Sequence, residues 1–365
     1  MQLHITTYGT YLHVKDAMFD IKRRGEDGKI ASVATYSVEK VTHILLATGT
    51  LLSTDAVKLA MRHNVDIVFL ERDGDPLGRV WHTKLGSTTR IRKRQLETSL
   101  NADGLRWIRT WLLAKLDNQA GFVRGLKKHR PQHTDFLDDK LTRLDALSLS
   151  ISTLVGTAAG GGPAVCVADV ADTLRGLEGT AGRLYFETLS YVLPRDYQFN
   201  GRSSRPAQDA FNAFLNYAYG MLYGKVEKTL MLAGLDPYLG FLHRDDYNQL
   251  SMVYDFIEPY RGFADEVVFR LFSAKKVNKA HVSEVSGSKN AVSTGAASTG
   301  GVSLNAEGKE LLVNTFNKFM DNDPIRYRGR NLTRSHCIQL DAHSFAQELL
   351  GGKGDKPVDI STVQL

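Results

Sequence analysis

The spacing of the apolar residues changes near Ser87, and this change constrains the fold more than any other feature. Before it, short runs rich in β-branched and aromatic residues are separated by glycine turns at Gly9, 25–28 and 73–74, a pattern typical of strands. After it, apolar residues recur every three or four positions, which is the spacing of one helix face. We therefore predict an α+β chain with a small β-rich N-terminal domain at 1–86 and a larger all-α domain at 87–365.

Individual elements follow from the same patterns. Ser53-Thr54-Asp55 is typical of a helix N-cap and predicts a helix through Arg62. The segment 286–303 is rich in Gly, Ser and Ala and cannot bury enough apolar surface to fix its backbone, so we expect a mobile loop there. We expect another loop at 160–163, strands at 3–7, 11–14, 30–33, 41–46, 65–70 and 77–81, and helical spacing over 91–112, 135–154, 170–189, 207–232, 250–272 and 304–350.

Composition excludes several classes of protein. The chain has 365 residues, 42% of them hydrophobic, which is enough to bury a sizeable core. Two cysteines, Cys166 and Cys337, allow neither a disulfide framework nor a zinc-finger spacing, which fits a reducing cytoplasm. The N-terminus has no basic stretch leading into an apolar run, and the chain has no run of about 18 apolar residues. We therefore expect a cytoplasmic protein without a membrane span.

Positive charge is concentrated in one part of the chain. From Arg79 to Arg130 there are 13 Lys or Arg and three acids, so this window carries 13 − 3 = +10, whereas the remainder carries 33 − 37 = −4. The densest part contains Arg90, Arg92, Lys93 and Arg94. Clustered positive charge of this kind is typical of a protein that binds a polyanion such as nucleic acid. The alternative is a solvated helix face.

Glu178 is the first candidate for chemistry in the helical domain. It borders the apolar face of its predicted helix, and Gly176, Gly179 and Gly182 lie around it. Each glycine in a helix interior costs about 1 kcal/mol relative to alanine. Such a cost suggests that another group approaches this helix closely. The alternative is a partly exposed glutamate on a helix that packs through small residues.

Three further candidates lie in a short stretch. His243 sits in a loop that enters a helix, and a neutral imidazole is a common metal ligand. Asp255 and Glu258 are three residues apart and share one helical face, where they repel each other unless a positive group lies between them. Pro259 ends or bends the helix, and we expect it to expose the carboxylate end. Alternatively, local arginines such as Arg261 bind the pair.

Together these residues are a plausible site for Mg²⁺ or Mn²⁺. Carboxylate oxygens suit both ions, and a histidine favours Mn²⁺. Structural zinc is not expected, because the two cysteines are too far apart in sequence for a thiolate site.

The same residues resemble the motifs of a known family, the CRISPR-associated spacer integrases. The similar segments are Glu178-Gly-Thr-Ala-Gly-Arg183-Leu-Tyr-Phe, the stretch from Gly201 to Tyr217, and His243 followed 15 residues later by Glu258. The resemblance covers nearly the whole chain, with Met252 and Gly182 as small departures from the family's usual leucine and alanine. It implies a β-rich N-terminal domain and an α-helical catalytic domain with metal-dependent nuclease and spacer-integration activity.

The resemblance also implies roles for individual residues and partners. Glu178, His243 and Glu258 would be catalytic residues and metal ligands, with Asp255 as an alternate ligand or a support for one. Arg202 and Arg205 would contact phosphate, since arginine suits phosphate oxygens; ordinary surface charge is the alternative. The partners would be double-stranded DNA (prespacer and repeat), a small ferredoxin-like CRISPR-associated protein, and a second copy of the chain.

The sequence leaves one expectation about assembly and two alternative functions. The resemblance implies a dimer that pairs through the N-terminal domains, and we expect an exposed strand at 41–46 to be one that the partner could cover. A transposon-encoded integrase of the same fold is the closest alternative function. A non-catalytic DNA-binding scaffold that uses only the basic window is a more distant one.

Overall fold

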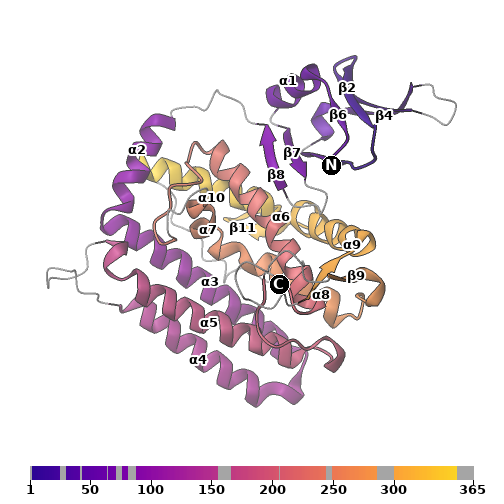
Figure 1. The fold of residues 1–365 in the computed structure, drawn as a ribbon. Helices are drawn as coiled ribbons and strands as arrows, with labels where there is room; N and C mark the ends of the chain where they lie inside the picture. The colour runs from indigo at the N-terminus through magenta and orange to yellow at the C-terminus, as the bar shows by residue number, and fades with distance from the viewer. Residues whose placement is uncertain are drawn as a thin grey trace, which may run out of the picture. The chain divides into compact units, whose positions relative to one another are not determined.

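The structure, a computed structural model, describes residues 2–24, 30–41, 43–63, 65–70, 76–80, 88–154, 166–204, 206–243, 249–285 and 300–351. It consists of two compact units, Met1–Gly86 and Ser87–Leu365. The first unit is rich in strands and the second is mainly helical (Figure 1). The prediction of a small β-rich region followed by a larger helical region is therefore confirmed.

One sheet of the N-terminal unit is mostly parallel. Its strand order is β1-β5-β7-β8, where β1, β5 and β7 run parallel and β8 is antiparallel to β7. Parallel strands need a crossover, and α1 (Thr54–Arg62) supplies it between β5 and β7. The Ser53 hydroxyl caps α1 by accepting a hydrogen bond from the Ala56 N–H at 3.1 Å, as its sequence predicts. The strand bounds are β1 Gln2–Ile5, β5 His43–Leu46, β7 Asp66–Leu70 and β8 Pro76–Val80.

The other sheet of this unit has the order β4-β3-β2-β6. Strands β2 (Tyr11–Lys15), β3 (Met18–Arg24) and β4 (Ile30–Ser37) form an antiparallel meander, and β6 (Leu51–Leu52) pairs in parallel with β2. Sequence analysis missed β3 and β6. β6 has only two residues, and β3 carries Asp20 at a fully buried position where an apolar residue would be expected.

The strand predicted at 41–46 is not an exposed edge. It is β5, which lies between β1 and β7, and Ile44 and Leu46 are buried in the core of the unit. The expectation that a partner covers this strand is wrong, because both of its backbone edges are already paired. The edge strands of the two sheets are β1, β8, β4 and β6.

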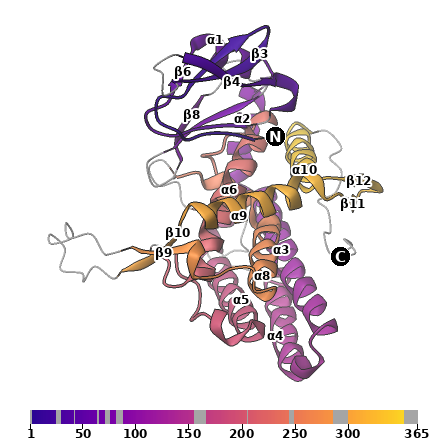
Figure 2. The same cartoon turned by 90° about the vertical axis from the view of Figure 1, so that its right-hand side faces the viewer.

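The helical unit is organised around one long helix, α3 (Ala102–Lys128). It packs against α2 (Thr88–Ser99), α4 (Thr134–Ser152), α5 (Ala171–Val192) and α8 (Arg261–Ser273). Figures 1 and 2 both show α3, α4 and α5 side by side. Two further helices, α6 (Ala210–Leu232) and α10 (Arg334–Leu349), pack against each other, and α6 also contacts α8. None of the helices in the described ranges is long and apolar enough to cross a membrane.

The helix predicted at 250–272 is interrupted. It consists of α7 (Ser251–Phe256), the 3-10 turn η5 (Glu258–Tyr260) and α8. Pro259 lies within the turn, and its missing N–H and its ring prevent a continuous helix. The prediction that this break exposes the carboxylate end is wrong, because Glu258 is only 4% exposed.

The helical unit also contains two hairpins, so its description as all-α needs correction. Residues 286–299 of the predicted mobile loop lie outside the described part of the chain, as does the loop predicted at 160–163. The end of the predicted loop is ordered as β10 (Gly301–Leu304), which pairs with β9 (Val282–Val285). Gly301 lies so close to Pro206 that an added Cβ would meet the proline Cβ at 2.4 Å. The close backbone approach at Gly301, together with Val302 and Leu304 packing on the core, therefore orders the end of the predicted loop.

The second hairpin interrupts the helical segment predicted at 304–350. It consists of β11 (Ile325–Tyr327) and β12 (Arg330–Leu332) and lies between α9 (Ala306–Asn317) with its π-helical extension (Lys318–Asn322) and α10. Figure 2 shows the two hairpins projecting on opposite sides of the helices.

Candidate active site

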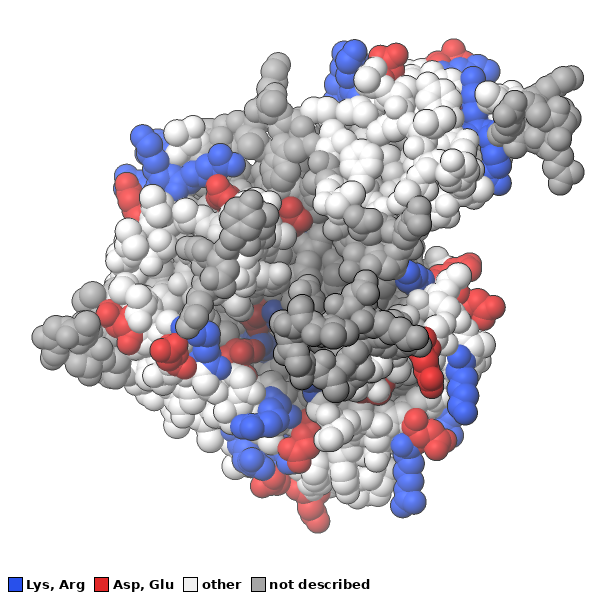
Figure 3. Space-filling model, viewed as in Figure 1, with Lys and Arg blue, Asp and Glu red and all other residues white. Residues whose placement is uncertain are grey.

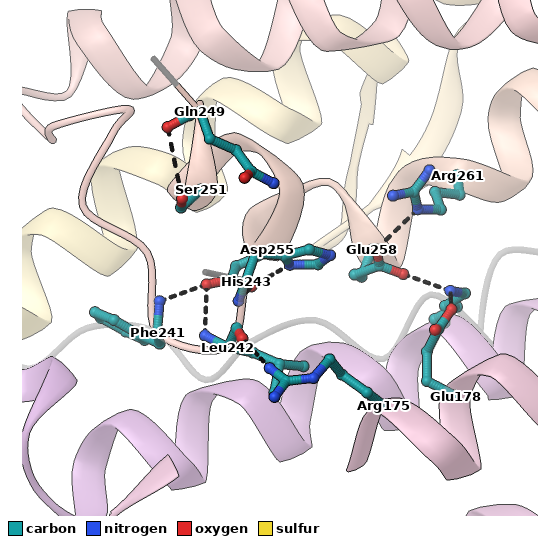
Figure 4. Close-up of polar contacts among 11 residues, drawn as sticks. Arg175, Glu178, Phe241, Leu242, His243, Gln249, Ser251, Asp255, Glu258 and Arg261 are labelled. Atoms are coloured by element: carbon teal, nitrogen blue, oxygen red, sulfur yellow. Dashed lines mark hydrogen bonds and ion pairs between the residues drawn. The ribbon is translucent and has the colours of Figure 1, made fainter. Parts of the chain in front are cut away.

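Two of the predicted site residues converge on a lysine that the sequence did not single out. Glu178 on α5 and Glu258 in η5 both contact the ammonium group of Lys115, which lies on α3. The Lys115 Nζ lies 2.6 Å from Glu258 Oε2, and it also donates a hydrogen bond to Glu178 Oε1. Lys115 and Glu258 are 5% and 4% exposed, so water screens this contact little. Figure 4 shows the two carboxylates pointing toward the same place.

The buried Glu258 is held in its charged form by two cations. The Arg261 Nε donates a hydrogen bond to Oε1 at 2.8 Å, whereas Oε2 accepts no well-directed hydrogen bond from the described residues. Burial alone would raise the pKa of Glu258, but the charges of Arg261 and Lys115 lower it to about 2. Burial would likewise lower the pKa of Lys115, yet the charges of Glu258 and Glu178 raise it.

His243 is held by Asp255, which is 1% exposed. The Nδ1 of His243 lies 2.6 Å from Asp255 Oδ1, and the carboxylate also accepts the backbone N–H groups of Phe241, Leu242 and His243 at 2.5, 3.0 and 3.1 Å. With Nδ1 donating to Asp255, Nε2 presents its lone pair away from this carboxylate. Figure 4 shows the imidazole between Asp255 and Glu258.

Gly240 allows this loop to approach α7 closely. A Cβ at Gly240 would meet the Ser251 Cβ at 2.6 Å and the Ser251 carbonyl carbon at 2.8 Å. Any larger residue would therefore push the loop, and with it His243, away from Asp255. The prediction that another group approaches α5 closely at the glycines around Glu178 is not supported. No described atom lies within 4 Å of a Cβ placed at Gly176, Gly179 or Gly182.

The predicted ligands are near one another but are not gathered around one point. Among the described residues, no three His, Cys, Asp or Glu side chains form a group that could hold a metal ion. Instead, Lys115 separates Glu178 from Glu258, and His243 is bound to Asp255. The alternative that local arginines bind the two carboxylates holds for one of them: Arg261 binds Glu258, whereas Asp255 binds His243 and backbone N–H groups.

A second buried carboxyl lies behind this site. Asp265 on α8 is 1% exposed and accepts the Tyr219 hydroxyl at 2.6 Å, while its Oδ2 has no hydrogen-bond partner among the described residues. Burial raises the pKa of Asp265 to about 6. Sequence analysis missed this residue because it lies in a helix among ordinary helix-forming residues.

Replacing Asp265 with asparagine is expected to stabilise the protein at pH 8 but not near pH 4. The folded pKa of about 6 lies above the ordinary 3.8, so the stabilising neutral form is fully present below pH 3.8 and is lost as pH rises through 6. The difference of about 2 pH units corresponds to about 3 kcal/mol. Urea denaturation at both pH values measures the change. An equal change in the free energy of unfolding at pH 4 and pH 8 would contradict the conclusion that burial raises the pKa of Asp265.

Comparison with known proteins now identifies the family. The sequence profile described as "CRISPR associated protein Cas1" matches residues 3–318. The chain belongs to the Cas1 family. The resemblance inferred from the motifs is thereby confirmed.

Two curated Cas1 relatives match along almost their whole length. The CRISPR-associated endonuclease Cas1 1 of Archaeoglobus fulgidus is 30% identical over 359 residues, which cover 96% of this chain and 97% of the relative. The CRISPR-associated endonuclease Cas1 1 of Thermus thermophilus is 26% identical over 352 residues, which cover 96% of each chain. The profile match over residues 3–318 includes all of the segments that carry the candidate active site.

Solved structures share the fold. A casposase bound to integration product superposes with a TM-score of 0.76 at 21% identity, and the match covers 99% of this chain and 93% of the casposase. A Cas1 protein from Thermotoga maritima superposes with a TM-score of 0.70 at 19% identity, covering 98% and 100% of the two chains. A Cas6-RT-Cas1–Cas2 complex gives 0.71 at 18% identity, covering 96% of this chain and 35% of the other.

The predicted DNA contacts of this Cas1 chain have different surroundings. Arg90, Arg92, Lys93 and Arg94 are exposed on α2, and Figure 3 shows Lys and Arg side chains gathered over this helix. Two of the four have acidic neighbours, because Arg92 lies 3.4 Å from Asp236 and Arg94 lies 2.6 Å from Glu97. Arg90 and Lys93 form no ion pair with any residue that the structure describes.

Arg202 is engaged inside the protein, and Arg205 lies outside the described residues. The Arg202 guanidinium donates to Asn212 Oδ1 at 2.9 Å and lies over the Tyr219 ring, with 5.4 Å between its Cζ and the ring centroid. Burial lowers the pKa of Arg202. These contacts favour a role in positioning the segment before α6 over contact with DNA.

Lys115 could have been suspected from its position in the sequence. It shares the buried face of α3 with Trp111, Leu112 and Gln119, and a lysine on an apolar face requires a charged partner. In the charge pattern, Lys115 is only one of the basic residues of the window from Arg79 to Arg130.

Proposed function

We propose that this Cas1 protein is a metal-dependent DNA endonuclease and integrase that inserts spacer DNA into a CRISPR array during adaptation. The observation that carries the proposal is the convergence of Glu178 and Glu258, from separate elements, on one buried cation beside an oriented histidine. Carboxylates brought together in this way repel each other unless a cation lies between them. A site built to share a cation is what a metal-dependent phosphoryl-transfer enzyme requires.

The residues present fit Mg²⁺ or Mn²⁺. Glu178, His243 and Glu258 would hold the ion, and they offer two carboxylates and an imidazole nitrogen, a donor set that suits these metals. Glu258 Oε2 has no well-directed hydrogen bond with the described residues, so it has a lone pair to offer. Asp255 is a poor direct ligand, because its oxygens already accept three backbone N–H groups and the His243 ring. Its role would be to orient His243.

The proposed reaction is a transesterification at phosphorus. When bound, the ion supplies Lewis-acid activation of the scissile phosphoryl group. A DNA 3′-hydroxyl attacks the phosphodiester at the edge of a repeat, and the 3′-oxygen of the target strand leaves. Attack by water at the same phosphorus gives hydrolysis, so cleavage and integration need only one site. Asp255 keeps Nδ1 of His243 occupied and so fixes the ring in one orientation.

The proposed partners are double-stranded DNA, a second copy of the chain and the small ferredoxin-like CRISPR-associated protein. Two structures of similar fold support the first and the last of these: the casposase is bound to integration product, and the Cas6-RT-Cas1–Cas2 complex contains Cas2. An integration assay with a linear prespacer and a repeat-bearing plasmid, with and without the small partner, tests the function. Insertion at the repeat edge that requires divalent metal is expected.

A transposon-encoded integrase is the alternative function, and the similarity of fold to a casposase supports it. The same assay separates the two functions when a matched plasmid without a repeat is included. A strong preference for the repeat-bearing plasmid supports spacer integration. Equal insertion into both plasmids would favour the transposon-type activity.

Replacing Asp255 with asparagine is expected to weaken Mn²⁺ binding by about 10- to 100-fold, because the support of a ligating histidine typically contributes this much. Calorimetric titration with Mn²⁺ measures the change. Asp20→Asn is a matched control, since Asp20 is also fully buried and lies 2.8 Å from a histidine nitrogen, His13 Nε2, in the other unit. It should lower stability and leave metal affinity intact. An unchanged Mn²⁺ affinity in Asp255→Asn would contradict the proposal that Asp255 supports His243 as a metal ligand.

A further inference from the structure

Lys115 takes the place that the proposed metal ion would need. Its ammonium contacts a carboxylate oxygen of Glu178 and lies 2.6 Å from Glu258 Oε2. Any cation that these two glutamates share must lie between them. An ion held by both, together with His243, therefore competes with the lysine for the same oxygens.

The charges of the group are balanced without a metal. Glu178 and Glu258 contribute two negative charges, and Lys115 and Arg261 contribute two positive charges, which are joined by contacts of Lys115 to both acids and of Arg261 to Glu258. A divalent ion added to this group would leave it with an excess of two positive charges around buried atoms. Repulsion between like charges at short range then favours the departure of the more mobile cation.

Of the two cations, Lys115 is the one that can leave. Arg261 donates to Glu258 through Nε and to the Tyr223 hydroxyl through a terminal nitrogen at 3.0 Å, so its guanidinium is fixed at two points. Lysine instead presents one ammonium group on a flexible four-carbon stem. Among the described residues, Lys115 forms its ion pairs with the two glutamates.

We propose that Lys115 is a built-in substitute for the metal, holding Glu178 and Glu258 together in the metal-free protein and being displaced from between them when the ion binds. This inference rests on the proposed metal site. It explains why two carboxylates can be kept near each other before metal arrives. It also implies that the metal binds more weakly than its ligands alone would allow, because it must displace a competing cation.

Lys115→Met provides the test, since methionine keeps much of the length and apolar bulk of the lysine stem without its charge. Without the competing ammonium, the variant should bind Mn²⁺ at least about tenfold more tightly than the wild type in calorimetric titration. The metal-free variant should melt at a lower temperature than the metal-free wild type, and Mn²⁺ should raise its melting temperature by more.

Lys140→Met is the matched control. Lys140 is also 5% exposed and pairs with a glutamate of α5, Glu187, at 2.9 Å, but it has no contact with the candidate active site. It should lower the melting temperature and leave Mn²⁺ affinity at the wild-type value. Equal or weaker Mn²⁺ binding by Lys115→Met would overturn the proposal, since it would make the lysine a support for the site rather than a competitor.

A structure of the wild-type protein with Mn²⁺ gives a second test that needs no substitution to fold. The Lys115 Nζ should no longer lie within about 4 Å of both carboxylates, the distance of an ion pair. Finding it still within this distance of both would overturn the proposal. The proposed function fails separately: if wild-type protein shows neither heat of Mn²⁺ binding nor a metal-dependent melting temperature, the metal site itself is absent.

Discussion

Glu178→Ala is expected to abolish metal-dependent cleavage and integration, with a loss of at least about a thousandfold, or about 4 kcal/mol of transition-state stabilisation. Glu178 is proposed to hold the ion, and without it the remaining donors are Glu258 and His243. The side chain of Glu178 is 31% exposed, and its loss leaves Lys115 still paired with Glu258. The fold should therefore survive, and initial rates with a labelled prespacer measure a chemical defect.

Glu187→Ala is the control for this experiment. Glu187 lies on the same helix and pairs with the buried Lys140, just as Glu178 pairs with the buried Lys115. It should retain wild-type activity with a comparable change in stability. If Glu178→Ala keeps activity within a few-fold of the wild type, the proposed catalytic assignment is wrong. DNA binding that persists while catalysis is lost would also reject a non-catalytic scaffold.

Alanine at Glu258 is a less informative variant, although it is proposed to hold the same ion. Glu258 is nearly fully buried between Lys115 and Arg261. Removing one partner of a buried ion pair typically destabilises a protein by about 3–5 kcal/mol, because the remaining charges are left uncompensated. A loss of activity in Glu258→Ala would therefore combine the effect of misfolding with the effect of a missing metal ligand. Of the two glutamates, Glu178 is therefore the one whose alanine variant we expect to stay folded.

The order of the two units was predictable because it depends on local spacing. Period-two runs and period-3.6 runs are visible within ten or twenty residues. Strand β3 was missed because Asp20 interrupts its apolar face. Asp20 is buried only because Ser32 and Thr35 of the neighbouring strand donate to it. Such a compensation exists only after the strands pair, so no local pattern reveals it.

The candidate active site was partly predictable for a similar reason. The spacing of His243, Asp255 and Glu258 is local, and family motifs mark Glu178. Lys115 is 63 residues from Glu178 and 143 residues from Glu258 along the chain, so only the packing of α3 against α5 and η5 reveals their contact. The division of roles between Asp255 and Glu258 likewise depends on packing: Asp255 lies in α7 and binds His243, whereas Glu258 lies in η5 and binds Lys115 and Arg261.

Counting charge along the sequence overstated the positive surface. In the second half of the window, Arg124 lies 3.5 Å from Asp145 and Lys127 lies 2.7 Å from Asp138, and both acids belong to α4. The densest group of positive charge that remains lies on α2. This narrows the predicted DNA contact to the exposed residues of that helix.

Changing Arg92, Lys93 and Arg94 together to alanine is expected to weaken DNA binding alike for many sequences. Each phosphate that a cation neutralises contributes about −0.9 to the slope of log affinity against log salt concentration, so three lost contacts change the slope by at most about 2.7. A fall of roughly 1 to 2.7 is expected, and it should lie below the upper value because Arg92 and Arg94 also have acidic neighbours. The integration site should not change, because phosphate contacts position a duplex without reading its bases.

The salt slope must be measured without the small partner protein, so that loss of a protein contact cannot imitate loss of a DNA contact. Arg124→Ala, Lys127→Ala and Arg143→Ala together form the control, since they remove the same charge from exposed helix positions that are paired with acids. That triple variant should keep a slope closer to the wild type than the α2 variant does, because all three of its cations have acidic partners, whereas Lys93 has none among the described residues. Identical slopes for the wild type and the α2 variant would mean that this cluster does not touch DNA and serves as a solvated face or a protein contact.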